Sequence, residues 1–197
     1  MRIIFSISIL FLLATSCSTK LVSNNYYQEH KTTLDNIESR YEKLNAAKPF
    51  AVAFTNKDLS RLSVEMISDT LTRIYEFHMN EQRLADSLHR FNYDTAGILT
   101  LIRKMQQTKV TWINSVDYYV NDEPRQLIYL SIKPITVRYL FSPPKYIALG
   151  YFRNPQSFDE KGRLLDNRRT KRVRKIKGQV FYKITDRICY TITDKYR

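Results

Sequence analysis

The sequence predicts an α+β protein built on an antiparallel sheet, and two observations support this fold class. Apolar residues recur at helical spacing near the N-terminus and twice in the middle of the chain, whereas other segments alternate as strands do. The order helix, strands, two helices, many strands differs from the strand–helix alternation of a parallel nucleotide-binding sheet. With 43% hydrophobic residues, 14 Tyr and 10 Phe, the chain can form the core that such a sheet needs.

The first residues have the features of an export signal. Arg2 precedes a mostly apolar run from Ile3 to Ala14, and small residues then lead to Cys17. A charged start, an apolar stretch and a small-residue processing site form a secretory signal peptide. The run is shorter than the ~20 residues of a membrane-spanning helix, and it lacks the polar face of a buried amphipathic helix. We therefore predict that residues 1–16 are a signal peptide.

The stretch Ala14-Thr15-Ser16-Cys17 resembles the lipobox of bacterial lipoproteins. The resemblance implies cleavage before Cys17 and acyl chains on that cysteine, which anchor the protein in a bacterial envelope without a transmembrane helix. Ala14 stands where Leu is more usual, so cleavage without lipidation is the alternative. Ser18 and Thr19 do not resemble the aspartate-based retention signal of the inner membrane. The expected location is therefore the outer membrane, facing the periplasm.

The only other cysteine is Cys189. If Cys17 is acylated, Cys189 has no partner within the chain, and we expect no internal disulfide. Its neighbours from Arg187 to Ile192 alternate as a plain strand. We therefore predict a small buried residue on a strand and not a nucleophile or redox thiol.

A single domain over 26–197 is expected to follow a lipidated N-terminus and polar tether over 17–25. The domain begins with an apolar stripe at spacings of three and four, which predicts an amphipathic helix over about 26–46. We expect this helix to pack on the domain's own sheet, and a coiled-coil partner is the alternative. The stripe consists of Tyr27, Leu34, Ile37, Tyr41 and Leu44.

Three strand-like runs then predict an antiparallel meander, after which the period changes to that of two short helices. The helices are expected around 84–91 and 98–105, with Asp94 as the N-cap of the second. A further antiparallel sheet of about five or six strands is expected from Val110 onward, with prolines at strand ends or edges. The predicted strands are 50–54, 62–66, 71–78, 110–120, 127–132, 135–141, 146–152, about 172–184, and 187–193.

The residues that carry catalytic or metal chemistry form no familiar motif. Of His30, His78 and His89, none belongs to a pair at a spacing of four. Glu76 and His78 share one strand face, near Glu81 or His89 in sequence, but surface histidines beside carboxylates are the simpler interpretation. Four glycines leave no phosphate-binding loop, and no GxSxG or SxxK motif is present. We therefore predict no catalytic residues, metal or cofactor, and a non-catalytic protein is favoured over an enzyme.

Positive charge is concentrated near the C-terminus. Between Lys161 and Lys177 there are nine Lys or Arg and one acid, Asp166, in a chain of net charge +13. Residues 153–177, the basic excursion, are expected to form a long exposed connection whose end runs into the next strand. An ordinary solvated loop that protects a sheet edge is one interpretation, and an anion-binding surface is the other. The anion-binding candidates are Arg168, Arg169, Lys171, Arg172, Arg174 and Lys175.

The anchor and the charge together suggest partners in the envelope. These are the membrane itself through lipid on Cys17, and anionic lipid, lipopolysaccharide phosphates or an acidic envelope protein through the basic excursion. Nucleic acid is disfavoured because export removes the protein from the cytoplasm. The sequence thus favours a lipid-anchored binding or scaffolding module. The alternative is a ligand-binding or hydrolytic domain with a pocket in the curved sheet, lined by Trp112, Tyr118 and Tyr129.

Overall fold

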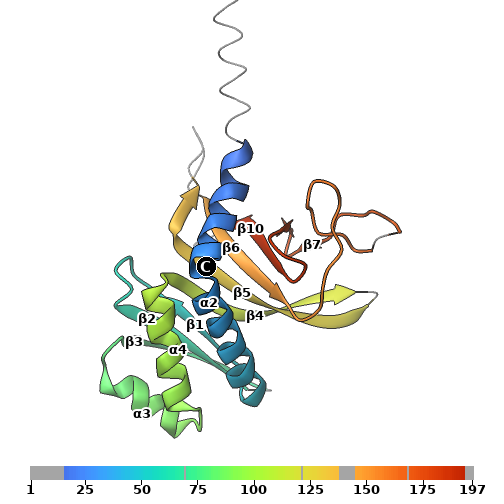
Figure 1. Cartoon of the computed structure of the whole chain (residues 1–197). Helices are drawn as coiled ribbons and strands as arrows, with labels where there is room; N and C mark the ends of the chain where they lie inside the picture. Colours follow the sequence, from blue (N-terminus) through green and yellow to red (C-terminus); the bar gives the residue numbers. More distant parts are fainter. Residues whose placement is uncertain (1–15, 69, 121, 138–144, 168, 194–197) are drawn as a thin grey trace, which may run out of the picture.

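The computed structural model describes residues 16–68, 70–120, 122–137, 145–167 and 169–193, with the backbone alone for 16–19 and 133–137. Within these ranges it has three helices, a large antiparallel sheet and a small two-stranded sheet (Figure 1). The helices are α2 (Ser16–Ala47), α3 (Gln82–Arg90) and α4 (Thr95–Gln107). The strands are β1 (Phe50–Phe54), β2 (Arg61–Ile67), β3 (Thr72–His78), β4 (Val110–Val120), β5 (Glu123–Val137), β6 (Lys145–Phe152), β7 (Lys175–Ile176), β8 (Gln179–Val180), β9 (Tyr182–Lys183) and β10 (Ile188–Thr193).

The α+β class with antiparallel strands is confirmed, but the two predicted groups of strands form one sheet. Its order is β3-β2-β1-β4-β5-β6-β10-β9, and β7 pairs separately with β8. The meander β1–β2–β3 is joined to the later strands by a short contact, in which Val52 pairs with Ile113 and Ala53 with Trp112. All three helices contribute buried residues to one core on this sheet, and the basic excursion contributes buried residues to a second core.

Helix α2 packs on the domain's own sheet, as predicted, with Leu34, Ile37 and Tyr41 fully buried. It begins at Ser16 and not near residue 26, so the predicted start of the helix is wrong and residues 17–25 are helical. Tertiary packing explains the difference: Ser23 is buried, and the Tyr26 hydroxyl donates a hydrogen bond to the carbonyl of Thr108 after α4. None of the helices in the described ranges is long and apolar enough to span a membrane.

The two predicted short helices and the predicted N-cap of the second are confirmed. Asp94 caps α4, because its carboxylate accepts a hydrogen bond from the amide of Gly97 at 2.9 Å. Leu84 and Leu88 of α3 are buried in the same core as α4.

Two strand predictions are wrong in detail. The runs 127–132 and 135–141 are parts of one strand, β5, whose pairing with β6 is interrupted between Ser131 and Thr136. Pro134 lies in that interruption. Because no strand-to-strand hydrogen bond is formed there, the lack of an amide proton on proline costs none. Residues 138–141 lie outside the described residues.

The predicted strand over 172–184 is broken into β7, β8 and β9. Lys177 and Gly178 both have positive φ, at 49° and 78°, and this turn folds β7 back onto β8. The last strand, β10, is confirmed. Its Cys189 is a free, fully buried cysteine, as the strand pattern predicted, and burial raises the pKa of its thiol.

Candidate functional site

The basic excursion is a packed segment and not the exposed loop that the sequence predicted. Leu164 and Ile176 are buried in the second core beside Phe152 and Phe181, and Leu165 is also buried. Within the excursion, Leu165 and Val173 pair through an isolated antiparallel β-bridge. The apolar residues that hold the excursion are few and irregularly spaced, which is why periodicity did not reveal them.

Arg174 is a buried residue whose hydrogen bonds connect two parts of the excursion. Only 6% of the residue is exposed, and its Nε donates to an Asp166 carboxylate oxygen at 3.0 Å. The two Nη atoms donate to the Asp166 carbonyl at 2.7 Å and to Gln156 Oε1 at 3.3 Å. The guanidinium also lies 5.6 Å from the ring centroid of Tyr118. With every nitrogen engaged internally, Arg174 does not belong to the exposed anion-binding set.

The other predicted cations that the structure describes, Arg169, Lys171, Arg172 and Lys175, are exposed. Arg172 is exposed and ion-paired to Asp166 at 3.5 Å, whereas Arg168 lies outside the described residues. Arg169, Lys171 and Lys175 form no side-chain ion pair with any residue that the structure describes. To these exposed cations of the excursion the structure adds Lys161, Lys177 and Arg153, the last of which is ion-paired to Glu42.

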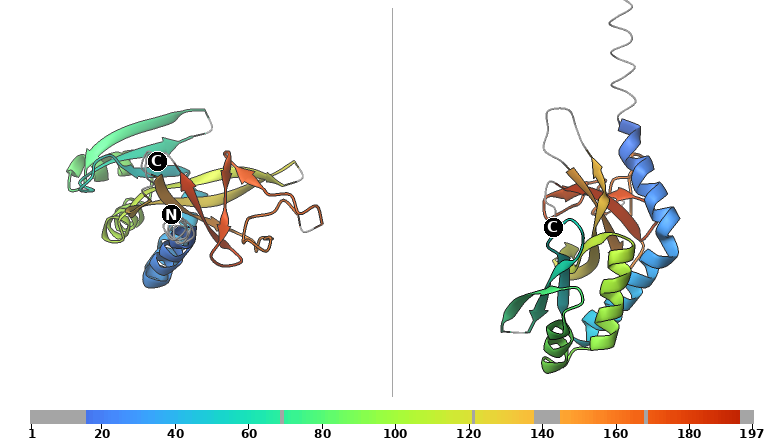
Figure 2. Two further views of the ribbon diagram at one scale, coloured as in Figure 1. Left: turned by 90° about the horizontal axis from the view of Figure 1, so that it is seen from above. Right: turned by 90° about the vertical axis from the view of Figure 1, so that its left-hand side faces the viewer.

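The excursion and the start of α2 lie toward the same end of the molecule. In Figure 1 the loops around β7 are level with the first half of α2, which begins beside Cys17. Helix α3 lies at the opposite end in both side views (Figures 1 and 2). The excursion that carries these cations therefore lies toward the same end as the first half of α2, which contains Cys17.

The histidine and carboxylate grouping around His78 makes local contacts. One Glu81 carboxylate oxygen accepts the His78 backbone amide at 2.9 Å, and the other pairs with Arg83 at 2.8 Å. Glu81 is thus engaged in the turn before α3. Among the described residues no group of three His, Cys, Asp or Glu could hold a metal ion.

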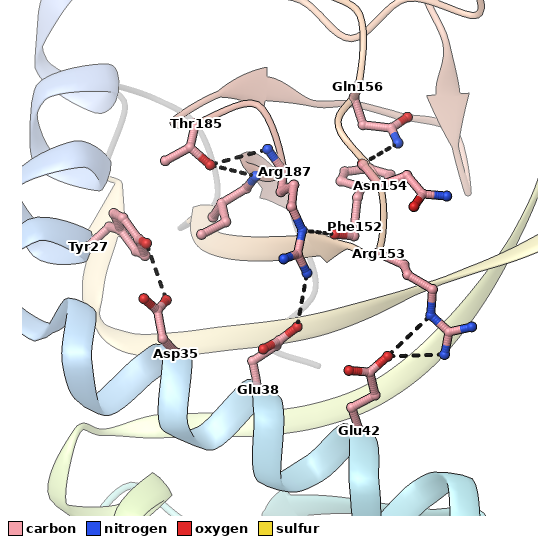
Figure 3. Close-up of polar contacts among 11 residues, drawn as sticks. Tyr27, Asp35, Glu38, Glu42, Phe152, Arg153, Asn154, Gln156, Thr185 and Arg187 are labelled. Carbon is pink, nitrogen blue, oxygen red and sulfur yellow. Dashed lines mark hydrogen bonds and ion pairs between the residues drawn. The ribbon is translucent and has the colours of Figure 1, made fainter.

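A second site, not predicted from the sequence, is a cleft of about 800 Å³ between the second half of α2 and the ends of β4, β5 and β6. Two ion pairs cross from α2 to the sheet beside this α2 cleft: Glu42 with Arg153 at 3.0 Å, and Glu38 with Arg187 at 3.7 Å (Figure 3). The charged and hydroxyl-bearing residues of the lining include Glu38, Glu42, Asp117, Arg125, Tyr151 and Arg153.

Tyr151 and Glu38 are the unusual groups of the α2 cleft. The Tyr151 hydroxyl is buried and has no hydrogen-bond partner among the described residues, which costs about 1–3 kcal/mol if nothing binds it. Burial and the Asp35 carboxylate raise its pKa. The pKa of Glu38 is also raised, first by burial and then by the Glu42 carboxylate, while Arg187 acts in the opposite direction.

The aromatic residues proposed to line a pocket in the sheet do so only in part. The rings of Trp112 and Tyr129 lie 5.4 Å apart and pack against the second core. Only Tyr118 of the three lines the α2 cleft. The sequence could have indicated the cleft in one way, since Asp35, Glu38 and Glu42 form an acidic stripe along one side of α2.

Comparison with known proteins identified no relative. No protein-family model matches the chain, and searches of curated proteins and of solved structures found no significant match.

Proposed function

We propose that the protein is a bacterial envelope lipoprotein, anchored by lipid on Cys17, that works as a non-catalytic binding module. Its braced basic excursion rests against an anionic phosphate-bearing membrane surface. The observation that supports this most is the set of exposed Lys and Arg on a segment held by the ion pair of buried Arg174 with Asp166, at the end of the molecule where α2 begins. A preordered surface binds without the entropic cost of ordering a loop.

The start of α2 fits an interfacial position. Leu21 and Val22 are 59% and 42% exposed, and Lys20 is exposed beside them. At 1.5 Å per residue, Leu21 lies about 6 Å along the helix from Cys17, within the depth that amphipathic helices reach at the headgroup boundary. Apolar side chains next to the anchor would then enter the leaflet while the excursion's cations meet its headgroups.

Vesicle binding tests the proposed role of the excursion. The mature chain, residues 17–197 with Cys17→Ser, is sedimented with phosphatidylcholine vesicles that contain or lack phosphatidylglycerol. We expect binding only to the anionic vesicles and a loss of binding as salt is raised, because each basic residue contributes up to about 1 kcal/mol and is screened by salt. Replacing five excursion cations by Gln should remove most of this binding. The variant is Arg169, Lys171, Arg172, Lys175 and Lys177→Gln.

A second variant with the same change in net charge is the control. It replaces exposed cations outside the excursion, and it should bind as the wild type does. Equal loss in both variants would mean that overall charge acts and the excursion has no special role. Salt-independent binding by all three proteins would also overturn the proposal. The control variant is Lys43, Lys57, Arg61, Arg90 and Arg103→Gln.

A further inference from the structure

We infer that the outer edge of β3 is a self-association site, where a second copy of this chain adds its own β3 in antiparallel register about a two-fold axis at Ile74. Strand β3 forms one margin of the large sheet (Figures 1 and 2). It pairs with β2 over seven consecutive residues without a register shift. The site is separate from the basic excursion, and the inference does not rest on the lipid anchor.

Two side chains at the start of α3 show which backbone groups of β3 point away from the sheet. Arg83 donates an Nη hydrogen to the Glu76 carbonyl at 3.2 Å, and the Glu81 carboxylate accepts the His78 amide at 2.9 Å. In an antiparallel strand the backbone groups of every second residue point to the same side. The even-numbered residues of β3 therefore direct their amides and carbonyls outward, and α3 covers this edge at its C-terminal end.

The rest of the β3 edge is open. No strand of the described chain lies beyond β3, so the outward-facing groups of Thr72 and Ile74 have no strand partner. The Ile74 side chain is 62% exposed, and Leu71, just before β3, is 51% exposed. Proteins commonly protect an edge with lysine, proline or a bulge, and β3 contains none of these. An open edge of this kind is a template for another strand.

The open groups are symmetric about Ile74, which favours a second copy as the added strand. With Ile74 opposite Ile74 of the copy, Thr72 lies opposite Glu76 on both sides of the axis. Three successive residue pairs can then exchange backbone hydrogen bonds, as in an isologous dimer. The exposed Ile74 side chains cover each other, and the exposed Leu71 lies opposite Phe77.

The charges of β3 select this register over its neighbours. With the axis at Ile74, Arg73 lies opposite Tyr75 and Glu76 opposite Thr72, so no like charges face each other. An axis at Arg73 or at Glu76 places that residue opposite its own copy, which is unfavourable. An axis at Tyr75 requires the His78 amide, which Glu81 already binds.

Sedimentation equilibrium of the mature chain, residues 17–197 with Cys17→Ser, tests the inference. We expect a weak monomer–dimer equilibrium, because one strand from each copy buries less than the ~1,200 Å² of a stable interface. Raising the salt concentration should strengthen the dimer, because copies of a chain with net charge +13 repel each other. The same change should weaken binding to anionic vesicles, so the two proposals fail independently.

A charge at the axis should remove the dimer. Ile74→Lys places two ammonium groups opposite each other, and we expect no dimer at any concentration at which the wild type forms one. Tyr119→Lys is the matched control. It makes the same change in net charge at an apolar residue of β4 that is 67% exposed, and it should dimerise almost as the wild type does.

Position 72 tests the register itself, because it should lie opposite Glu76 of the second copy. Thr72→Lys should strengthen the dimer and Thr72→Glu should weaken it, each by about threefold or more. Net charge alone predicts the reverse order, since Thr72→Lys makes the chain more positive. Circular dichroism and urea unfolding establish that each variant is folded.

Three results would overturn the inference. A wild type that stays monomeric up to about 1 mM would leave the edge to a strand of another protein. A dimer of unchanged affinity in folded Ile74→Lys would place the contact elsewhere. A weaker dimer for Thr72→Lys than for Thr72→Glu would exclude the register centred on Ile74.

Discussion

At the residue scale, Arg174 shows that the number of Lys and Arg in a segment does not reveal which of them are exposed. The sequence places it among six equivalent cations, but the structure buries it and bonds it to Asp166 and Gln156. A signal for this existed: Arg174 lies two residues before the apolar Ile176, on the same face of a strand-like segment. Tyr151 gave no such signal, because nothing in a single sequence indicates that a strand tyrosine will lack a hydroxyl partner.

Replacing Arg174 by Gln should destabilise the domain by about 2 kcal/mol, because the change removes charge-assisted hydrogen bonds and leaves the inner side of the excursion without its brace. Arg169→Gln, at an exposed position of the same segment, should change the free energy of unfolding by less than about 0.5 kcal/mol. Urea unfolding followed by circular dichroism measures both. Equal stability of the two variants would show that Arg174 braces nothing.

At the element scale, periodicity located most of the helices and strands but misjudged three boundaries. Residues 17–25 lack a regular apolar stripe, so their helical state follows from packing of Ser23 and Tyr26, which a local pattern does not register. Pro134 suggested a break in β5, yet the strand continues through an irregularity. The 172–184 segment alternates like a long strand, but the positive φ at Lys177 and Gly178 turns it into a hairpin.

The cap of α4 offers a direct test of an element that the sequence did predict. Asp94→Ala should lower the free energy of unfolding by about 1 kcal/mol, because the Gly97 amide loses its acceptor. Asp86→Ala serves as the control, since Asp86 is an exposed residue within α3 that accepts only a Gln82 side-chain bond. The two variants are compared by thermal and urea unfolding. A cost for Asp86→Ala as large as that for Asp94→Ala would argue against a specific capping role.

At the scale of the whole molecule, the fold class followed from the order of the elements, but the joining of two groups of strands did not. That joining depends on two residue pairs between β1 and β4, and a pairing of this kind between distant segments leaves no trace in local pattern. The same limit applies to the α2 cleft, whose lining comes from α2, the β4–β5 hairpin and the end of β6. The basic excursion could be recognised by composition because its charges are contiguous in sequence.

The basic excursion and the α2 cleft are two separate surface regions of the molecule. The end with the start of α2 and the exposed cations would face the membrane, whereas the α2 cleft lies between the second half of α2 and the sheet. The proposed membrane contact depends on the protein being held at an envelope surface, so the state of Cys17 is the central claim.

Metabolic labelling with an alkyne fatty acid, followed by fractionation of intact cells, tests that claim most directly. The full-length wild-type chain should incorporate the label and sediment with membranes. Cys17→Ser should lose the label and move to the soluble fraction, because a few basic and apolar side chains without acyl chains do not anchor a protein stably. The Cys189→Ser variant is the control and should behave as the wild type does. Unchanged labelling and membrane attachment of Cys17→Ser would contradict the lipoprotein account.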